Sequence, residues 1–295
     1  MFSATEAAFS GFRAGREHFA AMLVWIVVFG VLGAVTLFVA LPLLSPVLAQ
    51  VESLQGQTNP DPQVVLALFR QMMTSFLPLI IPALVIGAVQ SAAVNRLMLR
   101  PADRAFGYLR LGGDEVRQFL VALLLGVVIV VLEVVGCVLI VVVAFAARSI
   151  SPALAGLAVG VGFLALISTI LVVVVRLSLA KSQTFATGRI NLFGSWSLTK
   201  GHFWPIVGAY LLTAVLFMIT SMAVQAIAML AVFIGGGGFA GVGAAQEPDF
   251  SSLSAFLTLP VIINMIISLV ANPFLTLILQ CPAPEIYRQL AKGAV

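Results

Sequence analysis

The residues VALLLGVVIVVLEVVGCVLIVVVAFA occupy positions 121–146 and include a single charged side chain, that of Glu133. A helix needs about 20 predominantly apolar residues to cross a hydrocarbon core about 30 Å thick. The stretch meets this length with residues to spare. We therefore predict a transmembrane helix over residues 119–147, with Glu133 near its middle.

The composition of the whole chain also indicates a membrane protein. Of the 295 residues, 61% are hydrophobic and 9% are charged, whereas soluble domains carry about 25% charged residues. The surplus hydrocarbon is expected to face lipid. Five more apolar stretches are long enough to span a bilayer, namely 19–44, 76–97, 153–175, 204–234 and 253–279. The predicted fold is an all-α integral membrane protein with six transmembrane helices.

The segments between these stretches differ in charge. All Lys and Arg residues except Arg70 and Arg148 lie in one alternating set, formed by the N-terminus, segments 96–117 and 176–200, and the C-terminus. Cytoplasmic loops are enriched in Lys and Arg, and this bias sets the orientation of a multi-pass protein. We predict that both termini are cytoplasmic.

Three segments that precede the first, third and fifth stretches resemble one another. Aligned without gaps, Phe12, Leu109 and Trp196 fall in register, as do Arg16, Gly113 and Lys200. Repeats that run in the same direction are related by an axis along the membrane normal. We interpret residues 1–295 as a single polytopic domain of three hairpin repeats (1–98, 99–178 and 179–295), each preceded by an interfacial amphipathic helix. The alternative is a chance alignment, because low-complexity apolar sequence aligns readily with itself.

The segments before the hairpins mix apolar, aromatic and basic residues. Aromatic rings favour the membrane interface, and Lys and Arg side chains reach toward phosphate groups. We predict Trp196, Phe203 and Trp204 as interfacial anchors. The predicted contacts to anionic lipid headgroups are Arg110, Arg117, Arg189 and Lys200.

The segment that enters the fifth stretch carries a family resemblance. It reads RLSLA at 176–180, SWSLTKGHFW at 195–204 and YLL at 210–212. In this region the chain resembles the bacterial glycerophosphoryl diester phosphodiesterase membrane-domain family. The resemblance implies a helical membrane domain of the bacterial inner membrane. It does not imply phosphodiesterase activity, because the hydrolase of the fusions is a separate soluble domain, for which this chain has no room.

The polar inventory inside the predicted spans is short. An ionised carboxylate at the depth of Glu133 is costly, so the group must be protonated, paired or in contact with water. The candidate partners at a similar depth are Ser168, Thr169, Gln225 and Asn264. One interpretation is a proton or cation site. The other is a protonated Glu133 that hydrogen-bonds a neighbouring helix or another subunit.

The fourth stretch contains a motif typical of helix packing. Gly156 and Gly160 have the spacing of small residues that lets helix backbones approach closely. We predict that this face packs against another helix, with chance in a glycine-rich chain as the alternative.

Patterns typical of catalysis, metal binding or nucleic-acid binding do not occur. The sequence has no Gly-x-Ser-x-Gly elbow. His18 and His202 form a poor metal site, because Glu17 is the only carboxylate beside either of them in the sequence. Basic runs with interleaved aromatics on a polar background are also missing. We interpret Asp103, Asp114 and Glu115, which lie beside arginines, as a solvated charged face. The expectation is a protein without enzyme activity, metal, cofactor or nucleic-acid partner.

These observations favour a non-enzymatic, multi-pass inner-membrane protein. We predict a scaffold or accessory subunit that binds anionic membrane lipids or a partner membrane protein, the latter including a second copy of the chain. The alternative is a transporter or permease for a small or lipidic substrate, with Glu133 as a protonatable midplane site.

Overall fold

The computed structural model describes residues 2–54 and 61–292, and it is 87% helical with no strand in those ranges. The elements, in chain order, are α1 (Ala4–Glu17), α2 (Phe19–Leu54), α3 (Pro62–Leu99), the 3-10 turn η1 (Ala105–Tyr108), α4 (Gly113–Arg148), α5 (Pro152–Leu177), α6 (Ala180–Thr187), α7 (Leu192–Leu198), α8 (Phe203–Gly235), α9 (Gly238–Gln246), α10 (Leu253–Phe256), α11 (Leu259–Gln280) and α12 (Pro282–Lys292).

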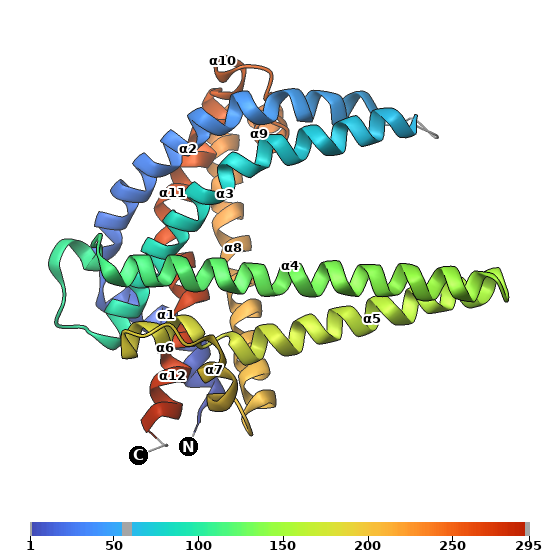
Figure 1. The fold of residues 1–295 in the computed structure, drawn as a ribbon. Helices are drawn as coiled ribbons and strands as arrows, with labels where there is room; N and C mark the ends of the chain where they lie inside the picture. Colours follow the sequence, from blue (N-terminus) through green and yellow to red (C-terminus); the bar gives the residue numbers. More distant parts are fainter. Residues whose placement is uncertain (1, 55–60, 293–295) are drawn as a thin grey trace.

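Six of these helices, α2, α3, α4, α5, α8 and α11, are long and apolar enough to cross a membrane. They pair as three hairpins, α2 with α3, α4 with α5, and α8 with α11 (Figure 1). The predicted all-α, six-span membrane fold is confirmed. Short elements precede each hairpin: α1 before the first, η1 before the second, and α6 and α7 before the third.

The helices of the first hairpin are longer than predicted. α2 continues to Leu54 with Pro42 and Pro46 inside it, and α3 begins at Pro62. Asp61 caps α3, because its side chain accepts a hydrogen bond of 2.8 Å from the backbone N–H of Gln63. Proline is also favoured in the first turn of a helix, where its missing N–H has no intrahelical partner. The described residues on either side of 55–60 therefore extend both helices beyond the predicted spans.

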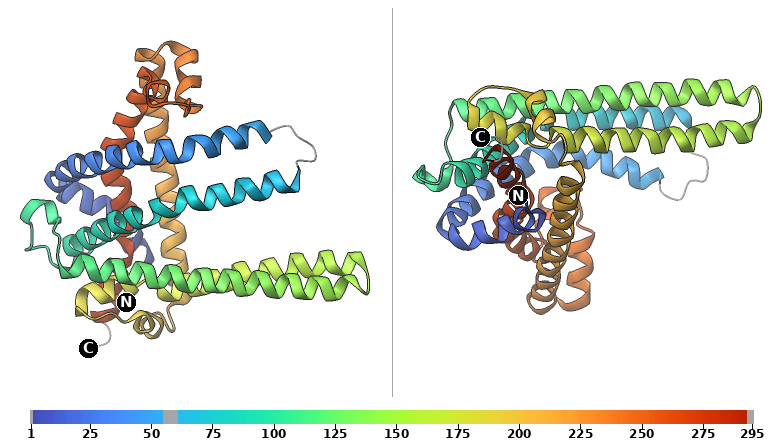
Figure 2. Two further views of the ribbon diagram at one scale, coloured as in Figure 1. Left: turned by 45° about the horizontal axis from the view of Figure 1, so that its top comes forward. Right: turned by 90° about the horizontal axis from the view of Figure 1, so that it is seen from below.

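The three hairpins leave a common region in different directions (Figure 1). Two further views show α1, α6, α7, α12 and both termini gathered at the base of the hairpins (Figure 2). We call this region the hub: α1, η1, α6, α7 and α12, with the adjoining ends of α2, α3, α4, α5, α8 and α11.

The hub holds most of the buried apolar side chains. Its largest cluster joins residues of α1, α2, α3, η1 and α11 around Trp25, which is 1% exposed. A second cluster joins α1, the end of α5, the start of α8 and α12. Helix α1 lies against α11 so closely that a Cβ on Gly11 would be 2.5 Å from the Cα of Ile278. Only glycine fits at this crossing.

A left-handed turn closes one side of the hub. Phe106, Gly107 and Tyr108 have φ angles of 50°, 63° and 65°, a region that residues with a Cβ seldom adopt. The turn is fixed by two hydrogen bonds to its carbonyls. Trp25 Nε1 donates to Gly107 O at 2.6 Å, and Arg96 Nη1 donates to Tyr108 O at 2.5 Å.

The hairpins away from the hub have few buried side chains. Along α4 and α5, close packing involves Gly162, where a Cβ would lie 2.7 Å from Ile140 Cγ1. Gly156 and Gly160, predicted as the packing face, have no heavy atom within 4 Å of such a Cβ. Within the described chain, that face of α5 meets no other helix.

Candidate functional site

A buried network of ion pairs organises the hub around Arg96. This side chain is 2% exposed, and its Nη2 lies 2.8 Å from Glu115 Oε1 and 3.4 Å from Asp114 Oδ2. Arg100, one turn further along the chain, lies 3.3 Å from Asp114 Oδ2 and donates to the carbonyl of Phe185 at 2.9 Å. Helices α3, α4 and α6 are thereby held together by charge.

This network corrects the sequence interpretation of a solvated charged face. Glu115 is only 6% exposed, because Arg96 at the end of α3 lies opposite it and compensates its charge. Charged residues are almost never fully buried unless they are paired. Only Asp103, half-exposed and 3.8 Å from Arg110, fits the predicted solvated face.

Beside the network lies a polar pocket of about 420 Å³. The residues that line it come from the ends of all three hairpins and from α6 and α12. They are Ser91, Asn95, Leu171, Val174, Val175, Ser178, Lys181, Ser182, Tyr210, Leu279, Gln280, Ala283 and Pro284. Pockets that bind small molecules have volumes of roughly 300–1,000 Å³, with apolar walls and a few polar groups.

Lys181 is the only charged residue in this lining. Its helix is fixed by Gln118, which is 1% exposed and donates from Nε2 to the carbonyl of Lys181 at 2.8 Å. Gln118 in turn accepts a hydrogen bond of 3.1 Å from Ser91 Oγ. Within residues 2–54 and 61–292, the Lys181 ammonium has no hydrogen bond and no ion pair. The pocket therefore contains a positive charge that no residue lining it compensates.

Three buried oxygens of the lining also have no partner in the described chain. Asn95 is 4% exposed, and its Nδ2 donates to the carbonyl of Ser91 at 2.7 Å, which leaves Oδ1 unpaired. Ser182 is 1% exposed, and its hydroxyl is unpaired as well. The Tyr210 hydroxyl lies near Ser178 but outside hydrogen-bond geometry. An unpaired buried polar group is costly, about 1–3 kcal/mol.

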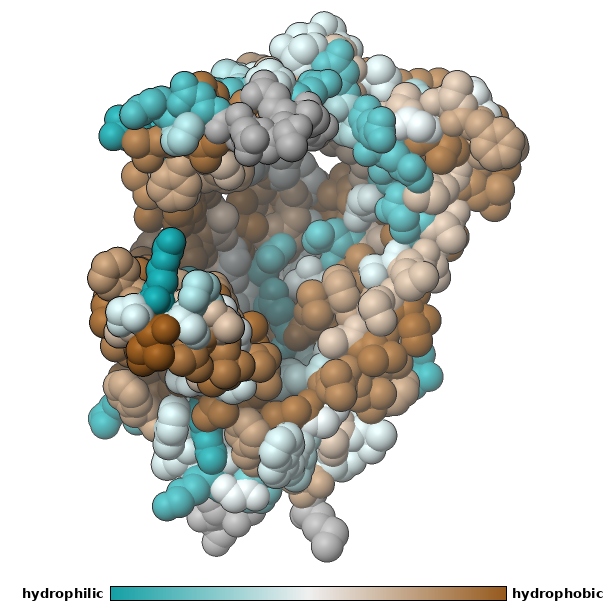
Figure 3. All heavy atoms as spheres, turned by 90° about the vertical axis from the view of Figure 1, so that its right-hand side faces the viewer, coloured by the Kyte–Doolittle hydropathy of each residue, from teal (hydrophilic) through white to brown (hydrophobic). Residues whose placement is uncertain are grey.

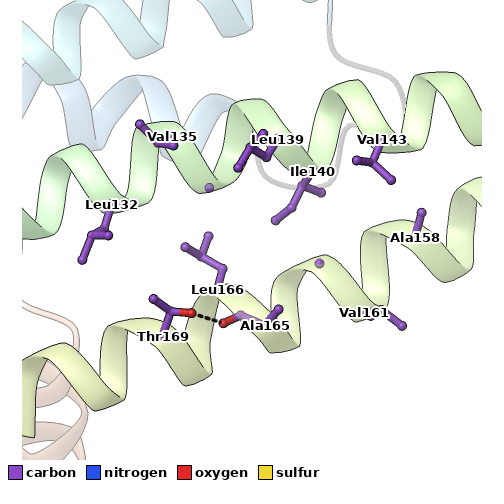
Figure 4. A pocket seen from close by; sticks show the side chains of 12 residues that line it. Leu132, Val135, Leu139, Ile140, Val143, Ala158, Val161, Ala165, Leu166 and Thr169 are labelled. Atoms are coloured by element: carbon purple, nitrogen blue, oxygen red, sulfur yellow. Dashed lines mark hydrogen bonds between the residues drawn. The ribbon is translucent and has the colours of Figure 1, made fainter.

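A second cavity of similar size, about 440 Å³, lies in the groove between α4 and α5 (Figure 4). Its lining is apolar apart from Thr169, whose hydroxyl donates to the carbonyl of Ala165 at 2.8 Å. The groove therefore offers contact with hydrocarbon but no free polar group. The unpaired polar groups lie in the pocket beside Lys181.

The residues predicted as hydrogen-bond partners of Glu133 do not contact it in the structure. Its side chain is exposed on α4 and has no hydrogen bond or ion pair with the part of the chain that is described. Ser168 and Thr169 donate to carbonyls of their own helix, at 2.7 and 2.8 Å. Gln225 and Asn264 instead line a small cavity with α9, and Asn264 Oδ1 is unpaired there.

The predicted headgroup contacts fall into two pairs. Arg110 and Arg117 have acidic neighbours, Asp103 at 3.8 Å and Asp114 at 2.5 Å. Arg189 and Lys200 are exposed, and neither has an ion pair in the described ranges. Both side chains are therefore accessible from outside the protein.

The predicted aromatic anchors surround an arginine. The guanidinium carbon of Arg176 lies 5.7 Å from the ring centre of Trp196 and 5.4 Å from that of Phe203. Trp204 packs edge to face on Phe203 and is 76% exposed. The three rings therefore lie together at the end of α5 and the start of α8.

No group of three or more potential metal ligands occurs in the described ranges. His18 lies apart, with Nδ1 3.3 Å from the hydroxyl of Tyr108. Partial burial lowers the pKa of His18, opposed by the nearby Glu17 and reinforced by Arg104. The arrangement suits a neutral imidazole at the rim of the hub.

Comparison of the chain with protein families, curated proteins and solved structures gave no match. The resemblance to the phosphodiesterase membrane-domain family therefore stays a prediction. The polar pocket was missed by sequence reasoning. The one signal that could have indicated it is Lys181, which follows an apolar stretch without an acidic residue nearby in the sequence.

Proposed function

We propose that this protein binds an anionic membrane amphiphile, with the negative headgroup on Lys181 and the hydrocarbon along the neighbouring apolar helices. The observation that carries the proposal is the uncompensated ammonium in a pocket whose lining has no acidic residue. Lys181 is half-buried, so its ammonium is partly screened from water and gains from a charged partner. A phosphate or other anion that enters the pocket restores the missing partner through a charge-assisted hydrogen bond.

The walls of the pocket support an amphiphile rather than a free anion. Leu171, Val174 and Leu279 line it and are also 53%, 49% and 47% exposed, so they continue onto the outer surface of the hairpins. Figure 3 displays a hollow between the hairpins, with hydrophobic atoms on its walls and hydrophilic atoms in its depth. A pocket that contains Lys181 and whose apolar walls continue onto the outer surface matches the two ends of a lipid.

The proposed setting follows from the charge distribution. We place the hub and both termini on the cytoplasmic side of a bacterial inner membrane, where Lys and Arg accumulate and anionic lipids attract them. The proposed role is that of a non-enzymatic accessory or scaffold protein. Binding rather than catalysis is favoured because the pocket supplies a cation and hydrogen-bonding groups but no base beside a nucleophile.

The test compares Lys181 with an exposed cation of the hub. The full chain is purified in a non-ionic detergent and titrated with phosphatidylglycerol and with phosphatidylcholine of the same acyl chains, and bound lipid is counted by native mass spectrometry. The wild-type protein is expected to retain phosphatidylglycerol in preference to phosphatidylcholine. Lys181→Gln should weaken phosphatidylglycerol binding about tenfold, the equivalent of about 1.4 kcal/mol, and Lys181→Arg should preserve most of it.

Arg16→Gln is the control, because Arg16 is an exposed cation of the hub without an ion pair in the described chain and is not among the predicted headgroup contacts. It should leave the affinity unchanged. If both glutamine variants lose the same affinity, general surface charge explains binding and the pocket proposal is wrong. Equal retention of the two lipids by the wild-type protein would also contradict it.

A further inference from the structure

The unpaired groups of the pocket specify more than a negative charge. Lys181 supplies donors for an anion, but Asn95 Oδ1 is an acceptor and requires a donor from the ligand. The orientation of the Asn95 amide is set by its own contacts, since Nδ2 donates to Ser91 O at 2.7 Å and lies 3.4 Å from Ser91 Oγ. A ligand that fills the pocket and satisfies both groups must carry a negative charge and a hydrogen-bond donor.

The hydrogen-bond donor of the ligand is not expected to be an ammonium group. A ligand ammonium in this pocket would lie near the Lys181 ammonium, and the lining contains no Asp or Glu to compensate a second positive charge. Like charges in a partly desolvated site repel. A hydroxyl, which is neutral and donates one hydrogen bond, meets the requirement without that repulsion.

We infer that the pocket selects a phosphodiester lipid whose headgroup alcohol carries a free hydroxyl, as in the glycerol and inositol headgroups. The phosphate lies on Lys181 and Ser182, and the headgroup hydroxyl donates to Asn95 Oδ1. This inference rests on the proposed binding of an anionic amphiphile and narrows its chemical class. The selectivity arises from the acceptor, because a site built to hydrogen-bond a ligand hydroxyl is left with an unpaired buried group when the hydroxyl is missing.

The test is a headgroup series on the full chain in detergent, with matched acyl chains and affinities from native mass spectrometry. The series contains phosphatidylglycerol, phosphatidylinositol, phosphatidic acid and phosphatidylethanolamine. It is run at pH 8.5, above the second pKa of a phosphate monoester at about 6, so that phosphatidic acid has no phosphate proton to donate. The glycerol and inositol lipids should each bind about tenfold tighter than phosphatidic acid, and phosphatidylethanolamine should bind more weakly than either.

Asn95→Leu removes the acceptor at nearly constant volume. It should lower phosphatidylglycerol affinity to the level of phosphatidic acid and leave phosphatidic acid unchanged. If the variant does not fold, the headgroup series on the wild-type protein still decides the matter. Phosphatidic acid that binds as tightly as phosphatidylglycerol overturns the hydroxyl inference and leaves the Lys181 proposal standing, provided that Lys181→Gln weakens both. Binding of all four lipids without dependence on Lys181 overturns both proposals.

Discussion

The hub and the α4–α5 hairpin are held together by different forces. The hub packs short helices through buried ion pairs, caps and a left-handed turn, with Arg96 2% exposed at its centre. The hairpin is two apolar helices joined by a short turn, in which Ser151 caps α5 by accepting a hydrogen bond of 3.2 Å from Leu154 N–H. Polar specificity is therefore concentrated where the hairpins converge, and the arms contribute length and hydrocarbon contact.

The largest expected effect comes from breaking the ion pairs of the hub. Arg96→Met leaves Glu115 buried without its partner, and removing one member of a buried pair costs about 3–5 kcal/mol. We expect a large drop in the thermal unfolding midpoint of the detergent-solubilised protein. Arg110→Met is the matched control, because Arg110 is 48% exposed and its nearest acidic neighbour is 3.8 Å away. Equal midpoints for the two variants would show that the hub is not held by this network.

The next effect tests how closely α1 approaches α11. Gly11→Ala places a methyl group 2.5 Å from Ile278 Cα, and such overpacking costs about 1–3 kcal/mol. Gly33→Ala is the control in the arm of α2, where no heavy atom lies within 4 Å of the added methyl. Unfolding midpoints should fall for the first variant only. If Gly11→Ala leaves the unfolding midpoint unchanged, α1 and α11 do not approach each other this closely.

A smaller effect concerns the left-handed turn. Trp25→Phe keeps the aromatic volume largely intact and removes the hydrogen bond to Gly107 O, at a cost of about 0.5–1.5 kcal/mol. Trp204→Phe at the exposed edge of α8 should have no effect. Chemical denaturation gives the free energy of unfolding of both variants and of the wild-type protein. A lower value for Trp25→Phe alone assigns the effect to the hydrogen bond, whereas equal losses assign it to the removal of an indole.

The smallest effect is a pH dependence at His18. The folded protein lowers the pKa of this histidine, chiefly through burial, so the unfolded chain binds the proton more readily. Stability is then fully present above the unfolded pKa of about 6.5 and declines as the pH falls through it. His18→Gln should reduce the change in the unfolding midpoint between pH 7.5 and pH 5.5. An unchanged slope in the variant would assign the pH dependence to other groups.

The hairpins could be predicted because their signal is local. Residues 121–146 identify a spanning helix without any knowledge of the rest of the chain. The turn between α4 and α5 follows similarly from Ser151 and Pro152, which favour the start of a helix. Hydropathy and capping therefore account for the six spans and most of their ends.

The hub and the pocket could not be predicted in the same way because their contacts are distant in sequence. Asn95, Ser178 and Lys181 come from the three different predicted repeats and meet only after the hairpins converge. The burial of Glu115 likewise depends on Arg96, which precedes the connection between two hairpins. A charged residue is expected to be exposed to solvent unless its ion-pair partner is known. The partner of Glu115 is Arg96, which lies on another helix.

The occupant of the pocket beside Lys181 can be observed directly. The most direct measurement is a structure of the full chain in nanodiscs that contain phosphatidylglycerol and phosphatidylcholine. We expect phosphate density within about 3 Å of the Lys181 ammonium, the length of a charge-assisted hydrogen bond, with an acyl chain along Leu171 and Val174. A pocket filled only by water, or by an acyl chain with its phosphate elsewhere, would contradict the account.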